Sequence, residues 1–155
     1  MDYKANLEKT IDNEFERSKR DTYFSLLLLI VIVIAYTIWQ SRNSQPLMLE
    51  WMGNTLQITD PEGQIYPLDL RDVTALSLRG SWDYGTVVQG GENRSCRYGL
   101  WENPELGTYR LYMWKASSSV ILLEIPDETV AISYETEEFT KDLYDMLTER
   151  LKEIK

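Results

Sequence analysis

The chain has 155 residues, with 16 Lys and Arg against 25 Asp and Glu and a formal net charge of −9, so it suits one modest acidic domain rather than a multidomain enzyme or a nucleic-acid binder. Because it has no histidine and a single cysteine, Cys96, it cannot form a Cys/His zinc site, a histidine-based catalytic pair or an internal disulfide. We therefore expect no catalytic residue, no metal site and no cofactor, and we predict that the chain is not an enzyme.

Residues 1–21 form a polar segment with a helical pattern. Apolar residues recur at every fourth position and opposite charges lie four residues apart, as on an amphipathic helix. The apolar positions are Tyr3, Leu7, Ile11 and Phe15, and the predicted ion pairs are Lys4/Glu8 and Glu16/Arg20. We predict a helix that continues into the next segment, either as a solvated extension or as a surface that docks on a partner or membrane.

Residues 22–41 carry no charge, and their centre, residues 26–35, is wholly aliphatic. As a helix this segment would rise about 30 Å, which matches the hydrocarbon core of a bilayer. A soluble domain of this size could hardly cover such a helix on every side. We therefore predict a transmembrane helix that places the chain in the lipid bilayer. Its ends carry aromatic residues, as membrane interfaces favour: Tyr23, Phe24, Tyr36 and Trp39.

The apolar segment is longer than the core of a cleavable signal peptide, and no small-residue cleavage site follows it. We expect it to be retained as an anchor. Its orientation follows from the basic residues near its ends, because Arg17, Lys19 and Arg20 precede it and Arg42 alone follows before Arg71. The positive-inside rule then predicts a single-pass protein of the cell membrane, with a cytoplasmic N-terminus and an extracytoplasmic C-terminal domain.

Residues 42–46 read as a linker and residues 47–155 as the domain, which contains 10 Lys and Arg, 19 Asp and Glu and hence the whole net charge. Short runs of β-branched and aromatic residues between turns predict a mainly β domain. Gly53-Asn54 fits a two-residue hairpin turn, and residues 80–99 are expected to be loop-rich. Strands are expected at residues 47–51, 55–59, 64–68, 73–78, 107–114, 120–125 and 129–134.

The last segment, residues 136–154, changes to a helical pattern. Thr136 suits the N-cap position, with Glu137 and Glu138 in the first turn where the helix dipole favours them. Because the apolar face must be buried, we expect this helix to cover an open end or edge of the sheet. The residues of that face are Phe139, Leu143, Met146, Leu147, Leu151 and Ile154.

Four short motifs resemble the bacterial pleckstrin-homology-like (PH-like) domain family, over roughly residues 47–151. They are RGSWDYGT at residues 79–86, YGLW at 98–101, GTYRLY at 107–112 and TEEF at 136–139. The resemblance implies a mainly β fold: a PH-like barrel of about seven antiparallel strands with a C-terminal capping α-helix, preceded here by the single transmembrane helix. It implies no reaction, because the family's members share no catalytic residues.

A cluster of arginine and aromatic residues is the candidate ligand or partner surface. Arginine above an aromatic ring can bind carboxylate, phosphate or peptide. The alternative is that the aromatic side chains pack the barrel while the arginines offset acidic neighbours. Phosphoinositide is an unfavourable ligand because of the net charge and the predicted outward location. The cluster consists of Arg79, Trp82, Tyr84, Arg94, Arg97, Tyr98 and Trp101.

Cys96 lies beside two of these arginines, where a thiolate would be favoured. We interpret it as a small apolar residue, with an intermolecular disulfide as the alternative. The acidic pairs Glu102/Glu105 and Glu137/Glu138 are interpreted as solvated surface, because no nucleophile or cationic clamp accompanies them. The sequence therefore predicts a membrane-anchored PH-like binding or scaffolding module with a possible protein partner. The alternative is an accessory subunit of a larger membrane complex.

Overall fold

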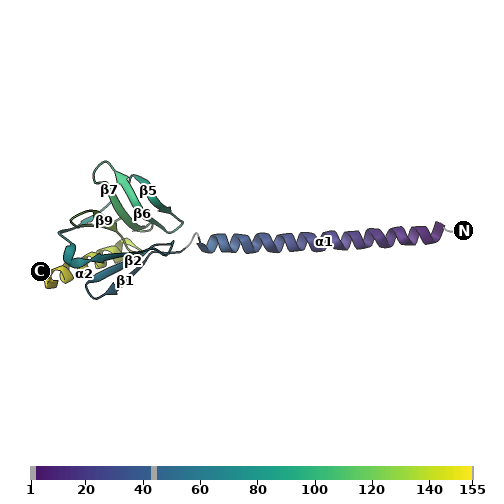
Figure 1. The fold of residues 1–155 in the computed structure, drawn as a ribbon, viewed down its shortest axis with the longest axis horizontal. Coiled ribbons are helices and arrows are strands. Elements are labelled where there is room, and N and C mark those ends of the chain that lie inside the picture. Colours follow the sequence, from purple (N-terminus) through teal and green to yellow (C-terminus); the bar gives the residue numbers. More distant parts are fainter. Residues whose placement is uncertain (1–2, 43–44, 155) are drawn as a thin grey trace. The chain divides into compact units, whose positions relative to one another are not determined.

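The computed structural model describes residues 3–42 and 45–154, with side chains at Lys19, residues 22–40 and residues 45–154. The chain divides into two units, Met1–Ser41 and Arg42–Lys155. The first is helical, and the second combines β-sheets with a C-terminal helix (Figure 1).

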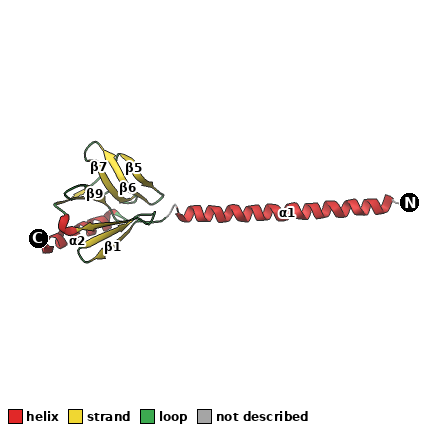
Figure 2. Ribbon diagram, viewed as in Figure 1, coloured by secondary structure: helices red, strands yellow, loops and turns green. Residues whose placement is uncertain are grey.

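The first unit contains one helix, α1, which runs from Tyr3 to Arg42 (Figure 2). Its stretch Thr22–Gln40 is long and apolar enough to cross a membrane, and all of its side chains are exposed. The Thr37 hydroxyl donates to the carbonyl oxygen of Ile34 at 2.8 Å, so this polar group is satisfied within the helix itself. The predicted helix before the apolar stretch is present, but its apolar stripe and ion pairs involve side chains outside the described residues.

The second unit contains two sheets and one long helix. A three-stranded antiparallel sheet has the order β1-β2-β3, and a six-stranded sheet has the order β4-β8-β9-β7-β6-β5. Neighbouring strands are antiparallel except β7 and β9, which run parallel. The elements are β1 (Met48–Met52), β2 (Thr55–Thr59), β3 (Ile65–Asp69), the 3-10 turn η1 (Leu70–Asp72), β4 (Ala75–Arg79), β5 (Thr86–Glu92), β6 (Cys96–Asn103), β7 (Gly107–Trp114), β8 (Val120–Glu124), β9 (Thr129–Ile132) and α2 (Glu137–Ile154).

The mainly β class and the C-terminal helix are as predicted, but the strand arrangement differs. The described residues form nine strands, so the expectation of about seven antiparallel strands is wrong in number and in the direction of one pair. The two sheets remain separate and are not closed. The predicted hairpin is confirmed, because Met52 pairs with Thr55 and Gly53 between them has a φ of 62°.

Residues 80–99 are not the loop-rich stretch that their glycines suggest, because they contain β5 and the start of β6. Gly90 and Gly99 lie opposite each other on these strands, and both have positive φ. A Cβ atom on Gly90 would lie 2.5 Å from the carbonyl oxygen of Tyr98. These glycines therefore allow two strands to approach closely beside a bulge, and they do not mark turns.

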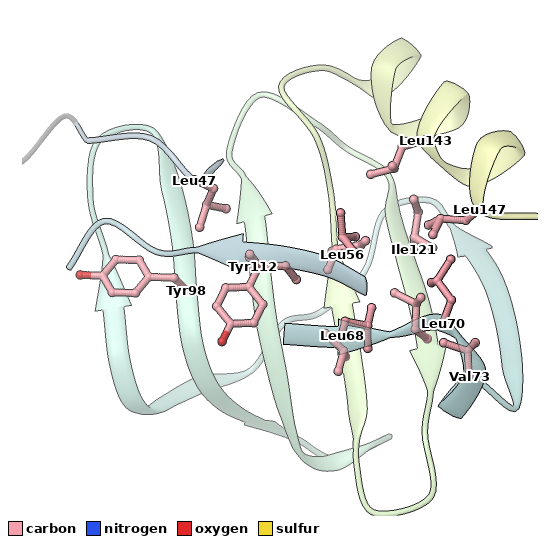
Figure 3. Close-up of a cluster of buried hydrophobic side chains, with 14 of the residues drawn as sticks. Leu47, Leu56, Leu68, Leu70, Val73, Tyr98, Tyr112, Ile121, Leu143 and Leu147 are labelled. Atoms are coloured by element: carbon pink, nitrogen blue, oxygen red, sulfur yellow. The ribbon is translucent and has the colours of Figure 1, made fainter. Parts of the chain in front are cut away.

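The central strands of the six-stranded sheet are buried on both faces. One face packs against the three-stranded sheet and α2, in a core that includes Leu56, Ile121 and Leu147 (Figure 3). Four successive residues of β8 are buried as a result, as in a strand without a solvent-facing side. The other face carries a second cluster, formed by Trp101, Tyr109, Leu111, Met113, Val120, Leu122 and Ala131, with Trp82, Tyr84 and Leu106 packed against it.

α2 begins and packs largely as predicted. The Thr136 hydroxyl accepts a hydrogen bond from the backbone N–H of Phe139 at 3.3 Å, and the helix contacts η1, β4 and β8. Because β4 is an edge strand, α2 does cover an edge of the sheet. Its apolar face is only partly buried: Leu143 and Leu147 enter the core, but Phe139 and Met146 each stay 46% exposed.

The contrast between adjacent residues on α2 gives a test of this packing. Leu147→Ala should destabilise the domain by about 2–5 kcal/mol, because it leaves a cavity in a closed core. Met146→Ala should change the free energy of unfolding by about 0.5 kcal/mol or less, since its side chain is largely exposed. The measurement is denaturant unfolding of the full-length protein in detergent, followed by tryptophan fluorescence. Equal effects of the two substitutions would contradict this placement of α2.

Candidate functional site

The seven residues of the predicted surface do not lie together on one exposed face. Tyr98 is buried in the core between the two sheets, and its hydroxyl donates to the Glu62 carboxylate at 3.1 Å. Trp101 is buried in the cluster on the opposite face of the six-stranded sheet, where its Nε1 donates to the Tyr98 carbonyl oxygen at 3.1 Å. These two side chains serve packing in this structure.

The structure does bring Trp82, Tyr84 and Arg97 together. The rings of Trp82 and Tyr84 meet edge to face with centroids 6.4 Å apart. The Arg97 guanidinium lies 4.4 Å from the centre of the Tyr84 ring, and its Nε lies 3.2 Å from the Glu92 carboxylate. The segment between β4 and β5 thus covers the second cluster, with Arg97 held over its aromatic surface.

Beneath the segment between β4 and β5 lie two buried polar groups, the Tyr109 hydroxyl and the Trp82 indole N–H. The Tyr109 hydroxyl donates to the carbonyl oxygen of Tyr84 at 2.6 Å, and burial together with the charge of Asp83 raises the pKa of Tyr109. Tyr109 therefore stays neutral and acts as a donor. The Nε1 of Trp82 is buried without a hydrogen-bond partner among the described residues.

The three arginines of the predicted surface have different environments. Arg79 pairs with Glu105, and Arg97 pairs with Glu92. Arg94 is exposed in the turn between β5 and β6, and it has no ion-pair partner in the described part of the chain. The explanation that arginines offset acidic neighbours therefore applies to Arg79 and Arg97, and Arg94 needs another explanation.

Cys96 does not have the electropositive surroundings that its neighbours in sequence suggested. Adjacent residues of a strand point to opposite faces, so the side chain of Arg97 lies away from the Cys96 thiol. Cys96 is fully buried, and burial raises the pKa of its thiol to about 11. The thiol stays protonated at neutral pH, and it packs in the core with its sulfur 3.3 Å from the side-chain oxygen of Asn93.

A polar clamp joins the three-stranded sheet to the six-stranded sheet. The Tyr66 hydroxyl donates to the Glu128 carboxylate at 2.6 Å, and Arg110 Nε donates to the same carboxylate at 2.8 Å. The Arg110 guanidinium also lies 4.7 Å from the centre of the Tyr66 ring. Burial and the hydrogen bond to Glu128 raise the pKa of Tyr66, so its hydroxyl stays neutral. The clamp therefore consists of the neutral Tyr66 hydroxyl and the Arg110 cation, both donating to the Glu128 carboxylate.

A groove between β4 and α2 has a volume of about 360 Å³. Its walls come from the start of the edge strand and from one side of the helix, spaced about one turn apart along α2. No described strand pairs with the outer edge of β4, the strand whose first residues line the groove. The lining residues are Val73, Thr74, Ala75, Leu76, Tyr144, Thr148, Leu151 and Lys152.

Sequence analysis did not predict this groove. The apolar spacing of α2 was visible, but it predicted only that the helix covers an open end or edge of the sheet. Whether a gap remains beside an edge strand depends on how two elements distant in the sequence fit together. One carboxylate of each acidic pair is used locally: Glu105 pairs with Arg79, and Glu137 pairs with Lys141. Among the described residues, no three side chains are grouped as metal ligands.

No protein-family model, curated protein or solved structure matches the chain. The PH-like resemblance continues to rest on the sequence motifs, and the site must be interpreted from its own chemistry.

The different surroundings of the arginines lead to a stability prediction. Arg97→Gln should lower the free energy of unfolding by about 1–2 kcal/mol, because it removes an ion pair and the contact with the Tyr84 ring. Arg94→Gln should change it by about 0.5 kcal/mol or less. Thermal unfolding of the two single variants in detergent distinguishes them. A larger effect at Arg94 would show that the arginine surroundings are described wrongly.

Glu92 gives a prediction of pH dependence. The Lys115 ammonium at 3.0 Å, together with Arg97, holds the pKa of Glu92 below its usual range. A carboxyl whose pKa is lowered by folding stabilises the fold above its unfolded pKa and loses that effect as the pH falls through the folded pKa. Glu92→Gln should therefore lower the melting temperature at neutral pH, and the difference from the unsubstituted protein should shrink in acid. A difference that is constant across pH would contradict the pairing.

Proposed function

We propose that the chain is a membrane-anchored binding or scaffolding module, with a PH-like domain held outside the cytoplasm. The helical stretch Thr22–Gln40 serves as the anchor in the cell membrane. The excess of basic residues before this stretch supports a cytoplasmic N-terminus. The combination of a mainly β domain with a C-terminal helix supports the PH-like assignment, although the sheets are not closed.

The single observation that carries this proposal is the groove beside the free edge of β4. An extended peptide could add to this edge through its backbone, as in strand addition, and place an apolar side chain in the groove. Leu76 and Leu151 supply apolar walls, and Thr148 and Lys152 supply polar groups at the lining. The favoured partner is a protein with an extended segment that carries an apolar side chain.

A second function, an accessory subunit of a larger membrane complex, is supported by α1. This helix continues without a break from Tyr3 through the span to Arg42. Such a helix presents one continuous surface to a neighbouring membrane protein. In this case the partner would recognise α1, and the β domain would have a secondary role.

Crosslinking in the native membrane distinguishes the two functions. A photoreactive residue replaces Thr148 in the groove, and the adduct is mapped on both partners. We expect Ala75→Glu, which places a charge in the groove, to reduce the adduct severalfold. Thr86→Glu, on the opposite edge strand of the sheet, is the matched control and should leave the adduct unchanged.

The span provides the competing test in the same assay. Replacement of residues 22–40 by an unrelated apolar helix of equal length should preserve the adduct if this stretch is only an anchor. Loss of the adduct on that replacement, with no effect of Ala75→Glu, would establish the subunit function and overturn the groove proposal. Both altered proteins must retain a cooperative thermal transition for the comparison to count.

A further inference from the structure

The chain enters the β domain at a fixed point. The side-chain amide of Asn93 donates to the carbonyl oxygen of Gln45 at 2.8 Å, and the Cys96 sulfur lies 3.9 Å from the same oxygen. Two residues later, Leu47 is buried in the core. Gln45 is therefore held against the domain, within the segment that the sequence suggested as a linker.

Chain length sets how far this point can lie from the membrane span. Four residues lie between Gln40, the last residue of the apolar stretch, and Gln45, so the chain takes five steps from one to the other. An extended chain covers at most about 3.6 Å per residue, so Gln45 lies within about 18 Å of Gln40. The headgroup layer on each side of a bilayer is about 5–8 Å thick. The limit comes from the covalent chain alone and holds for any orientation of the two units.

The domain surface near Gln45 exposes two large apolar side chains. Met48 is 51% exposed at the start of β1, and Ile65 is 60% exposed at the start of β3. Both pair with Thr59 in the three-stranded sheet, so they lie in one row across it. Two exposed apolar side chains such as Met48 and Ile65 are suited to contact a bilayer at the boundary between its headgroups and its acyl chains.

Arg94 lies next to Asn93 in the same region, and it is the one lysine or arginine among residues 45–154 for which no partner is found. The nearby carboxylates are already used: Glu92 pairs with Arg97 and Lys115, and Glu62 accepts from the Tyr98 hydroxyl. The other cations are paired with Asp or Glu, or in one case with a carbonyl oxygen and an aromatic ring: Arg71, Arg79, Arg97, Arg110, Lys115, Lys141, Arg150 and Lys152.

We propose that this end of the domain rests on the lipid headgroup layer, with Arg94 binding a phospholipid phosphate and Met48 and Ile65 in contact with the interface. A guanidinium suits a phosphate because it can donate two parallel hydrogen bonds. The net charge of −9 opposes binding of the free domain to anionic lipid. The tether overcomes this opposition because it makes the contact intramolecular, at high effective concentration. The surface recognises phosphate rather than a particular headgroup, and the proposal rests on the membrane anchoring proposed above.

Site-specific fluorescence in vesicles tests the contact. The full-length protein is reconstituted in phosphatidylcholine vesicles that contain phosphatidylglycerol and a lipid quencher at headgroup depth. A fluorophore is attached to Met48→Cys or, as the matched control, to Met52→Cys. Both methionines are exposed on the same strand face, and Met52 is about 13 Å farther along it. Because Cys96 is buried with a raised thiol pKa, the introduced cysteine can be labelled selectively at neutral pH.

We expect severalfold stronger quenching at position 48 than at position 52. Arg94→Gln should reduce the quenching at position 48 severalfold, and Arg71→Gln, near the far end of β3, should not. Equal quenching at both positions, or no effect of Arg94→Gln, would overturn the proposed contact. These results count only for protein that floats with the vesicles. Failure to float would instead overturn the membrane anchor, so the two proposals can fail separately.

Discussion

The β domain depends on the burial of the central strands of its six-stranded sheet on both faces. In β8, Val120 and Leu122 point to one cluster and Ile121 and Leu123 to the other, and all four are almost fully buried. Each large side chain contributes about 1.5–3 kcal/mol on burial, so this strand alone supplies an amount comparable to the stability of a small domain. A sheet of this kind needs a cover on each face. The three-stranded sheet and α2 cover one face, and the segment with Trp82 and Tyr84 packs against the other.

This need for two covers explains why the arginine and aromatic cluster is divided. Tyr98 and Trp101 point to opposite faces of β6, so Tyr98 enters the core between the sheets and Trp101 enters the cluster on the other face. Arg97 closes over Tyr84 and is neutralised by Glu92, while the clamp of Tyr66, Arg110 and Glu128 neutralises charge between the sheets. In an acidic domain such pairing leaves few cations available to a ligand. Arg94 differs from these paired residues, because its side chain is exposed and belongs to neither core cluster.

The groove and the proposed membrane-facing surface lie at opposite ends of the three-stranded sheet. Near the groove, Arg150 of α2 donates to the carbonyl oxygen of Gly53, in the β1–β2 turn. Met48 and Ile65 mark the other end of the same sheet. Figure 3 shows the same separation in the core, with Leu47 and Tyr98 toward one side and Val73 and Leu147 toward the other. A domain that rests on lipid at one end would therefore keep its groove accessible to a partner.

The sequence by itself determined the features that depend on local pattern. The length of the apolar stretch, the strands at residues 55–59 and 107–114, the Gly53-Asn54 turn and the capped helix α2 follow from local composition, hydrophobic period and backbone preferences within a few residues. Only the tertiary structure decided the rest. Gly90 and Gly99 signalled turns because the close approach of β5 and β6 was not visible in either segment alone. The parallel pairing of β7 with β9, the gap beside β4 and the isolation of Arg94 likewise depend on contacts between distant parts of the chain, where packing and charge pairing override local preference.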